Sequence, residues 1–243
     1  MEHVSAYTHF APELFLPRPK RAPRPKRDPY DGLRPWSAIT HGAGAILAAV
    51  GTLMLLTRSA SMGKWLHFGL FAVYGLSMIC LYTASTLYHC LNVSVPGRIA
   101  LRKYDHCSIY LLIAGSYTPI CLTALARSGG IPLLIGVWGL AAAGLVLTLS
   151  KLNIPRWLSS VIYLAMGWLA IFAVVPIYRA LPAAGFFWLL AGGILYSIGG
   201  VLYAVKWPGR NNPRFGCHEI FHLFILLGSA AHFVLMYRVV AFL

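Results

Sequence analysis

Residues 218–240 read HEIFHLFILLGSAAHFVLMYRVV, and between Glu219 and Arg238 this stretch contains no Asp, Glu, Lys or Arg. A helix needs about 20 apolar residues to cross the hydrocarbon core of a membrane, so the stretch predicts a transmembrane helix. It also carries two histidines, His218 and His222, at its beginning. The stretch therefore indicates that lipid surrounds the chain and that polar groups lie at one end of a span.

The rest of the sequence repeats this pattern. The seven predicted spans are residues 36–57, 66–89, 106–126, 131–150, 157–178, 185–205 and 218–240. With 58% hydrophobic residues, 11% charged residues and a mean hydropathy of +0.69, the composition excludes an ordinary soluble domain. We expect an all-α integral membrane bundle of seven helices. Glycines within the spans suit close contacts between helices. They include Gly42, Gly44, Gly136, Gly139, Gly144, Gly192, Gly193, Gly199 and Gly200.

The first 35 residues differ in kind from the rest. Prolines alternate there with arginines and lysines, a composition that predicts a disordered basic tail. The tail has no apolar core followed by a small-residue cleavage site, so it is not expected to be a secretory signal peptide. The predicted organisation is a tail at 1–35 and a transmembrane domain at 36–243.

The formal net charge of +14 would suggest nucleic acid binding in a soluble protein. Here the positive charge flanks the spans, so it indicates topology, and no nucleic acid partner is expected. With a cytoplasmic N-terminus, the inner connections hold 15 of the Lys and Arg residues and the outer ones 5. The predicted protein lies in the cell membrane with its N-terminus inside and its C-terminus outside.

Ionisable side chains gather at the predicted cytoplasmic ends of three spans. Ionisable groups at membrane depth are costly and are candidates for function. His89 ends the second predicted span, Asp105 precedes the third, and His218 and His222 open the seventh. The alternating direction of the spans places all four side chains at one depth.

The spacing of these residues favours a metal site. His218 and His222 are four residues apart, so a helix presents both rings on one face, about 6 Å apart along its axis. With His89 they supply three nitrogen ligands, the usual count for a catalytic zinc that keeps a fourth position for water. Asp105 could hold or deprotonate that water, and Ser85 lies one turn from His89 on the same helix face.

The alternative is that these histidines are interfacial residues bonded to backbone or lipid headgroups. Convergence of three histidines and an aspartate from distant parts of the sequence favours the metal site. The five cysteines are scattered and predict no disulfide. Cys90, Cys107 and Cys217 each lie within two residues of a site residue but should point away from it on a helix.

Other polar residues are weaker candidates. His41 could line the site or make a polar helix contact. We expect His106 to face away from the site and Glu219 to pair with a basic loop residue such as Arg214. His232 lies about 15 Å beyond His222 along a helix, too far to bind the same ion.

Several motifs occur together after residue 34. They are Thr40-His41-Gly42, Ser85-x-x-x-His89, Asp105-His106, Ala114-Gly115-Ser116-Tyr117-Thr118-Pro119, and His218-Glu219-x-x-His222 with Gly228-Ser229 and His232. In combination they resemble the bacterial hemolysin III family, a branch of the progestin and adipoQ receptor superfamily. The resemblance runs from about Arg34 to the end of the chain.

This resemblance implies a seven-span bundle with a cytoplasmic N-terminus and a zinc ion near the cytoplasmic face. The three zinc histidines of the family correspond to His89, His218 and His222, its serine to Ser85, and its aspartate to Asp105. The family often has Glu and Asn at two positions near the start of the first span. This sequence has Arg34 and Ser37 at those positions. Any role that the Glu and Asn pair has in other members is therefore not assigned to this protein.

Three functions follow as hypotheses. The first is a zinc-dependent intramembrane hydrolase of a lipid amide or ester, similar to ceramidases, with Asp105 as general base and Ser85 stabilising a ligand or oxyanion. The second is a non-enzymatic regulator of membrane fluidity or energy homeostasis with structural zinc. The third is a pore-forming hemolysin, which is disfavoured because the polar groups cluster at one end of the spans. In each case the expected partners are membrane lipids.

Overall fold

The computed structural model describes residues 33–150, 156–210, 212 and 214–243, with the side chains of residues 156 and 157 left out. The predicted tail at 1–35 lies almost entirely outside the described residues. From Leu33 to Leu243 the chain forms one compact unit, and its described residues are helical or in short connections, without strands.

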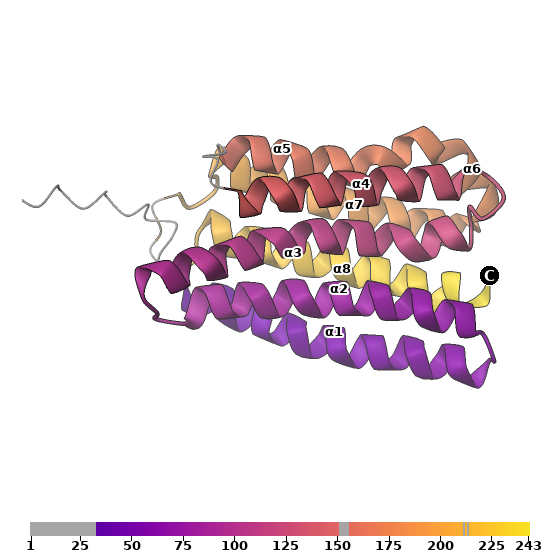
Figure 1. Ribbon diagram of the computed structural model, residues 1–243, viewed down its shortest axis with the longest axis horizontal. Coiled ribbons are helices and arrows are strands. Elements are labelled where there is room, and N and C mark those ends of the chain that lie inside the picture. Colours follow the sequence, from indigo (N-terminus) through magenta and orange to yellow (C-terminus); the bar gives the residue numbers. More distant parts are fainter. Residues whose placement is uncertain (1–32, 151–155, 211, 213) are drawn as a thin grey trace, which may run out of the picture. The chain divides into compact units, whose positions relative to one another are not determined.

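Within the described residues, seven helical passes run side by side (Figure 1). The passes are α1 (Pro35–Ser61), α2 (Trp65–Cys90), α3 (Val95–Leu122), α4 (Gly130–Leu149), the broken pass α5–η2–α6, α7 (Ala183–Val205) and α8 (Cys217–Arg238), followed by the short η3 (Val240–Phe242). α1 begins at one end of the bundle and the C-terminus lies at the other, as an odd number of passes requires (Figure 1).

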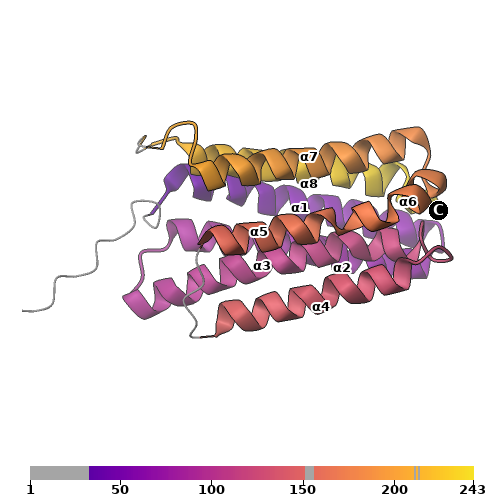
Figure 2. The same ribbon diagram turned by 90° about the horizontal axis from the view of Figure 1, so that it is seen from above.

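Contacts between helices close a ring. α1 packs on α2 and α8, α2 packs on α3, α3 on α5, α5 on α7, and α7 on α8. α4 packs on the outside of α3, on the opposite side of the bundle from α7 (Figure 2). Leu55, Phe71 and Leu235 are fully buried in the main apolar core.

The outer faces of the helices suit lipid. Six passes are long and apolar enough to cross a membrane, and large apolar side chains such as Ile46, Leu47 and Phe172 remain exposed, Phe172 at 84%. Exposed apolar surface on this scale is unusual for a soluble monomer. The chain is a multi-pass membrane protein, as predicted.

The third pass differs from its prediction. α3 begins at Val95, well before His106, because Ser94 caps it by accepting a hydrogen bond from the Gly97 amide at 3.4 Å and Pro96 favours its first turn. Its first turns carry Arg98, Arg102, Lys103 and Asp105, so α3 does not meet the apolarity of the other six passes. Asp105 consequently lies inside a helix.

Basic side chains in α3 hold the ends of neighbouring helices. Arg98 donates from Nη1 to the Tyr88 carbonyl at 3.1 Å, and Lys103 donates to the Leu149 carbonyl at 2.8 Å. The last carbonyls of a helix have no partner within it, and basic groups near a helix C-terminus are favourable. These residues, which the sequence marks as topology signals, thus also cap α2 and α4.

The predicted role of the glycines in close helix contacts is confirmed only in part. A methyl group on Gly44 would meet Tyr82 and Leu226, and one on Gly144 would meet Tyr110. Gly192 is pressed against His232 in the same way. By contrast, Gly136, Gly139, Gly193 and Gly200 face open space, so their expected packing role was wrong.

The fifth pass is interrupted where the sequence predicts one continuous helix. It consists of α5 (Arg156–Gly167), the 3-10 helix η2 (Trp168–Ala173) and α6 (Val174–Ala180). Pro176 lacks an amide hydrogen and its ring clashes with the carbonyl four residues earlier, which disfavours an α-helix through η2. The Tyr117 hydroxyl lies 2.7 Å from the Gly167 carbonyl and 3.1 Å from that of Met166, and accepts from the Ala170 amide at 2.9 Å.

Replacing Tyr117 with Phe should therefore destabilise the protein by about 1–3 kcal/mol, since polar backbone groups lose their partner in the interior. Thermal unfolding in detergent micelles would measure the change. Tyr178→Phe, at a position with 64% exposure, is the matched control. Equal melting temperatures for the two variants would contradict this account of the broken pass.

Candidate metal centre

Three histidines meet where α2 ends and α8 begins. His89 lies in the last turn of α2, and His218 and His222 lie in the first turns of α8, at the same end of the bundle (Figure 1). All three are buried, and one candidate ligand atom from each lies within 4.8 Å of the others. The Nε2 atoms of His89 and His218 are 3.1 Å apart.

This arrangement fits a metal ion. A zinc–nitrogen bond of about 2.0–2.1 Å implies about 3.3–3.4 Å between two nitrogens of a tetrahedral site, close to the spacing of His89 and His218. The Nδ1 atoms of the three rings are buried without a protein hydrogen-bond partner. Metal-bound histidines usually donate a hydrogen bond from their second nitrogen, and these three have no such acceptor in the protein. The evidence for a metal site is therefore the convergence of the three ligand atoms.

Asp105 lies within electrostatic reach of His89 but outside the ligand group. Its carboxylate is 14% exposed and lies within electrostatic reach of His89 and His41. Oδ2 of Asp105 is 3.5 Å from Nδ1 of His106, while His106 itself lies outside the group of three histidines. Because α3 starts at Val95, Asp105 and His106 both lie within this helix, and its N-terminal turns flank the site.

Ser85 is buried on α2, four residues before His89. That spacing places it one turn further into the bundle on the face that carries His89, as the sequence predicts.

A fourth histidine joins the cluster. His41 on α1 is 3% exposed, and its ring stacks on that of His222 with centroids 3.6 Å apart and planes 10° apart. Sequence reasoning left its place open, because no spacing in α1 relates it to α8.

Glu219 is held by α1, which corrects the predicted pairing with Arg214. Its Oε1 accepts from Arg34 Nη1 at 2.8 Å and from the Ser37 hydroxyl at 2.9 Å, while its Oε2 accepts from the Gly216 amide at 2.8 Å. The ion pair is shielded, with side-chain exposures of 12% for Arg34 and 1% for Glu219. The Arg34 amide also donates to the His89 carbonyl at 3.1 Å, so one residue joins the starts of α1 and α8 to the end of α2.

A group of hydroxyls lies further along α8. Tyr82 donates to the Ser229 hydroxyl at 2.6 Å, and the Tyr196 hydroxyl lies 2.9 Å from the same oxygen. The Tyr82 ring also meets His41 edge-on, with centroids 5.1 Å apart. The sequence did not single out the tyrosines, although Ser229 belongs to one of its motifs.

The remaining candidates lie apart from the ion site. Cys90 is exposed, Cys107 and Cys217 are buried, and all are free thiols. Among the described residues no cysteine joins the histidine group. His232 lies 3.3 Å from the Leu189 carbonyl.

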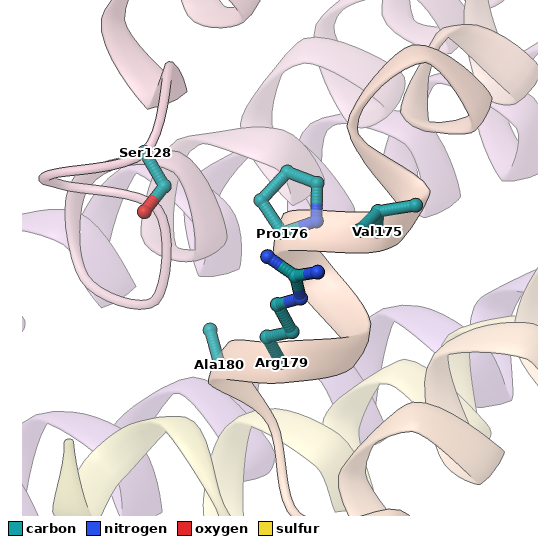
Figure 3. Close-up of a pocket in the computed structure, with 5 residues that line it drawn as sticks. All are labelled: Ser128, Val175, Pro176, Arg179 and Ala180. Carbon is teal, nitrogen blue, oxygen red and sulfur yellow. The ribbon is translucent and has the colours of Figure 1, made fainter.

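A separate hollow of about 250 Å³ lies at the other end of the bundle. Figure 3 shows its lining, which comes from α6 and from the connection between α3 and α4. The lining residues are Ser128, Val175, Pro176, Arg179 and Ala180. Since these helix ends are opposite to those that carry the histidines, the hollow is not part of the metal centre.

Comparison with known proteins gives consistent matches. The family model described as Haemolysin-III related matches residues 35–233. A hemolysin-3 homolog of Bacillus subtilis (strain 168) is 42% identical over 205 residues, covering 84% of this chain and 93% of the relative. Hemolysin-3 of Bacillus cereus is 40% identical over 197 residues, covering 81% and 87%. More distantly, an adiponectin receptor protein of Drosophila melanogaster is 25% identical over 236 residues, covering 82% and 50%.

Removing Arg34 should strongly destabilise the site. Arg34→Ala leaves the Glu219 carboxylate buried without its cation, which we expect to lower the free energy of unfolding by about 3–5 kcal/mol. Denaturant or thermal unfolding in detergent would measure the loss, with Arg127→Ala at an exposed position as the control. If both variants unfold alike, the ion pair does not hold these helix ends together.

Proposed function

The chain belongs to the haemolysin-III related family, and from that premise we propose that it is a membrane-embedded zinc protein that hydrolyses lipid amide or ester bonds. The observation that carries the proposal is the composition of the site. Three buried histidines converge, while Asp105 lies within electrostatic reach of His89 without joining the ligand group.

Zinc suits this set of ligands. Neutral imidazoles are common zinc ligands, and three protein ligands are the usual number in catalytic sites. When bound, zinc would polarise a carbonyl and lower the pKa of a bound water. His89, His218 and His222 would hold the ion.

Asp105 would act as the general base. Its side chain is partly shielded from solvent, lies within electrostatic reach of His89 and approaches Nδ1 of His106 to 3.5 Å. In this role it takes a proton from the attacking water and returns it to the leaving group, a function that contributes typically 10²–10⁴-fold to a rate. Ser85, one turn deeper on α2, would donate a hydrogen bond to the substrate oxygen on which charge develops.

The position of the site favours a lipid substrate. The histidines are buried at one end of a bundle whose outer faces are apolar, so the polar linkage of a lipid lies at a comparable depth while its chains remain in the membrane. An amide or ester carbonyl is the group in such a lipid that zinc, a base and a hydroxyl donor can act on together.

A non-enzymatic regulator with structural zinc is the second candidate. An ion at this position would join α2 to α8, which supports the idea. A structural site is usually closed by four protein ligands. In the described part of the chain, neither a cysteine nor a carboxylate completes the group of three histidines, so the hydrolase is favoured.

The test combines metal content with hydrolysis. Purified protein should contain about one zinc per chain, His218→Ala should lose it, and Asp105→Ala should keep it. Incubation with ceramides and ester lipids should release fatty acid from the parent protein, and Asp105→Ala should reduce that rate at least about 100-fold. His67→Ala, on the opposite end of α2, is the control for loss of a histidine.

The outcomes separate the candidates. Stoichiometric zinc without hydrolysis of any amide or ester lipid would support the regulator. Parent protein without stoichiometric metal would overturn both proposals.

A further inference from the structure

His41 is the histidine of the cluster that has no role in the proposed hydrolysis. It lies on α1, and its neighbours are well defined. One face of its ring covers His222 at a centroid distance of 3.6 Å, and the Tyr82 ring meets it edge-on. The side chain is 3% exposed, so neither bulk water nor lipid reaches most of it.

Both ring nitrogens of His41 are buried without a hydrogen-bond partner in the protein. A neutral imidazole always carries one N–H donor and one acceptor nitrogen. The backbone of His222 lies near the ring, but not in hydrogen-bond geometry. Burying an unpaired polar group costs free energy, and within a membrane the bilayer offers no substitute partner.

The position of His41 indicates where its partner lies. Its nitrogens do not belong to the compact group formed by His89, His218 and His222. Asp105 and His89 are nevertheless within electrostatic reach of the ring. From the side of α1, His41 therefore touches one candidate ligand, His222, and lies within electrostatic reach of another, His89, and of the candidate base Asp105.

We propose that His41 binds the ligand of the metal centre: its ring N–H donates a hydrogen bond to the small anion or carbonyl oxygen held between the three histidines and Asp105. This inference rests on the proposed zinc site and adds a contact that selects an oxygen-bearing or anionic ligand. Stacking on His222 fixes the orientation of the donor.

Azide binding to the cobalt-substituted protein tests this role without using catalysis. Co²⁺ replaces the bound metal and its absorption reports on ligands of the ion, so azide can be titrated spectroscopically. His41→Phe keeps a flat ring that can stack on His222 but has no nitrogen. His41→Asn keeps a donor on a shorter side chain, and His67→Phe removes a buried histidine at the far end of α2.

The dissociation constant for azide should rise about tenfold in His41→Phe, the equivalent of one hydrogen bond. His41→Asn should recover part of the affinity, and His67→Phe should match the parent. Cobalt content and the azide-free spectrum should be the same in all four proteins.

Parent-like azide affinity in His41→Phe would show that the ring only packs, and would overturn the inference while the metal centre stands. Loss of cobalt from His41→Phe would also overturn it, because the ring would then serve to hold the ion. A parent protein that binds no stoichiometric cobalt would remove the metal centre and this contact together.

Discussion

The absence of water from a lipid core is the constraint on which this structure depends, because each buried polar group must then find its partner within the chain. In the broken fifth pass, the Tyr117 hydroxyl bonds to backbone carbonyls and to an amide that the interruption leaves without partners in the helix. These groups belong to Met166, Gly167 and Ala170. The buried carboxylate of Glu219 accepts hydrogen bonds from Arg34, Ser37 and the Gly216 amide. Single atoms of His67, Tyr74 and His106 are also buried without a partner, but His41, His89, His218 and His222 lie together, and this clustering of unpaired nitrogens points to a site that takes a ligand.

The topology assembles the site from distant parts of the sequence. Short connections make successive helices antiparallel, so the starts of α1, α3 and α8 and the end of α2 share one end of the bundle (Figure 1). Arg34 then ties three of these ends together, through its side chain to Glu219 and through its amide to the His89 carbonyl. The residues that stabilise the bundle end are thus immediate neighbours of the candidate ligands, and the two roles share one local framework.

Much of the fold could be predicted because hydropathy and span length are local properties. The start of α3 could not, because the apolar run begins after the charges of Arg98 and Lys103 while the helix continues through them. The convergence of His89 with His218 and His222 could be predicted from residue spacing within a helix and from the alternating direction of the spans, because both are properties of the sequence alone. The stacking of His41 on His222 and the pairing of Glu219 depend on how α1 crosses α8, which no pattern within either helix specifies.

The Arg34–Glu219 pair shows how a departure from a family pattern can be accommodated. The resemblance leads one to expect Glu and Asn at positions 34 and 37, and a glutamate at position 34 would place a second carboxylate against Glu219. Like charges at that distance in a shielded site would repel, or would need a proton or a cation between them. Here the guanidinium supplies the positive charge and Ser37 supplies a smaller donor. Arg34 therefore supplies the cation that the buried carboxylate of Glu219 requires. The charge of Glu219 is balanced without a contribution from the histidines or from the ion that they would hold.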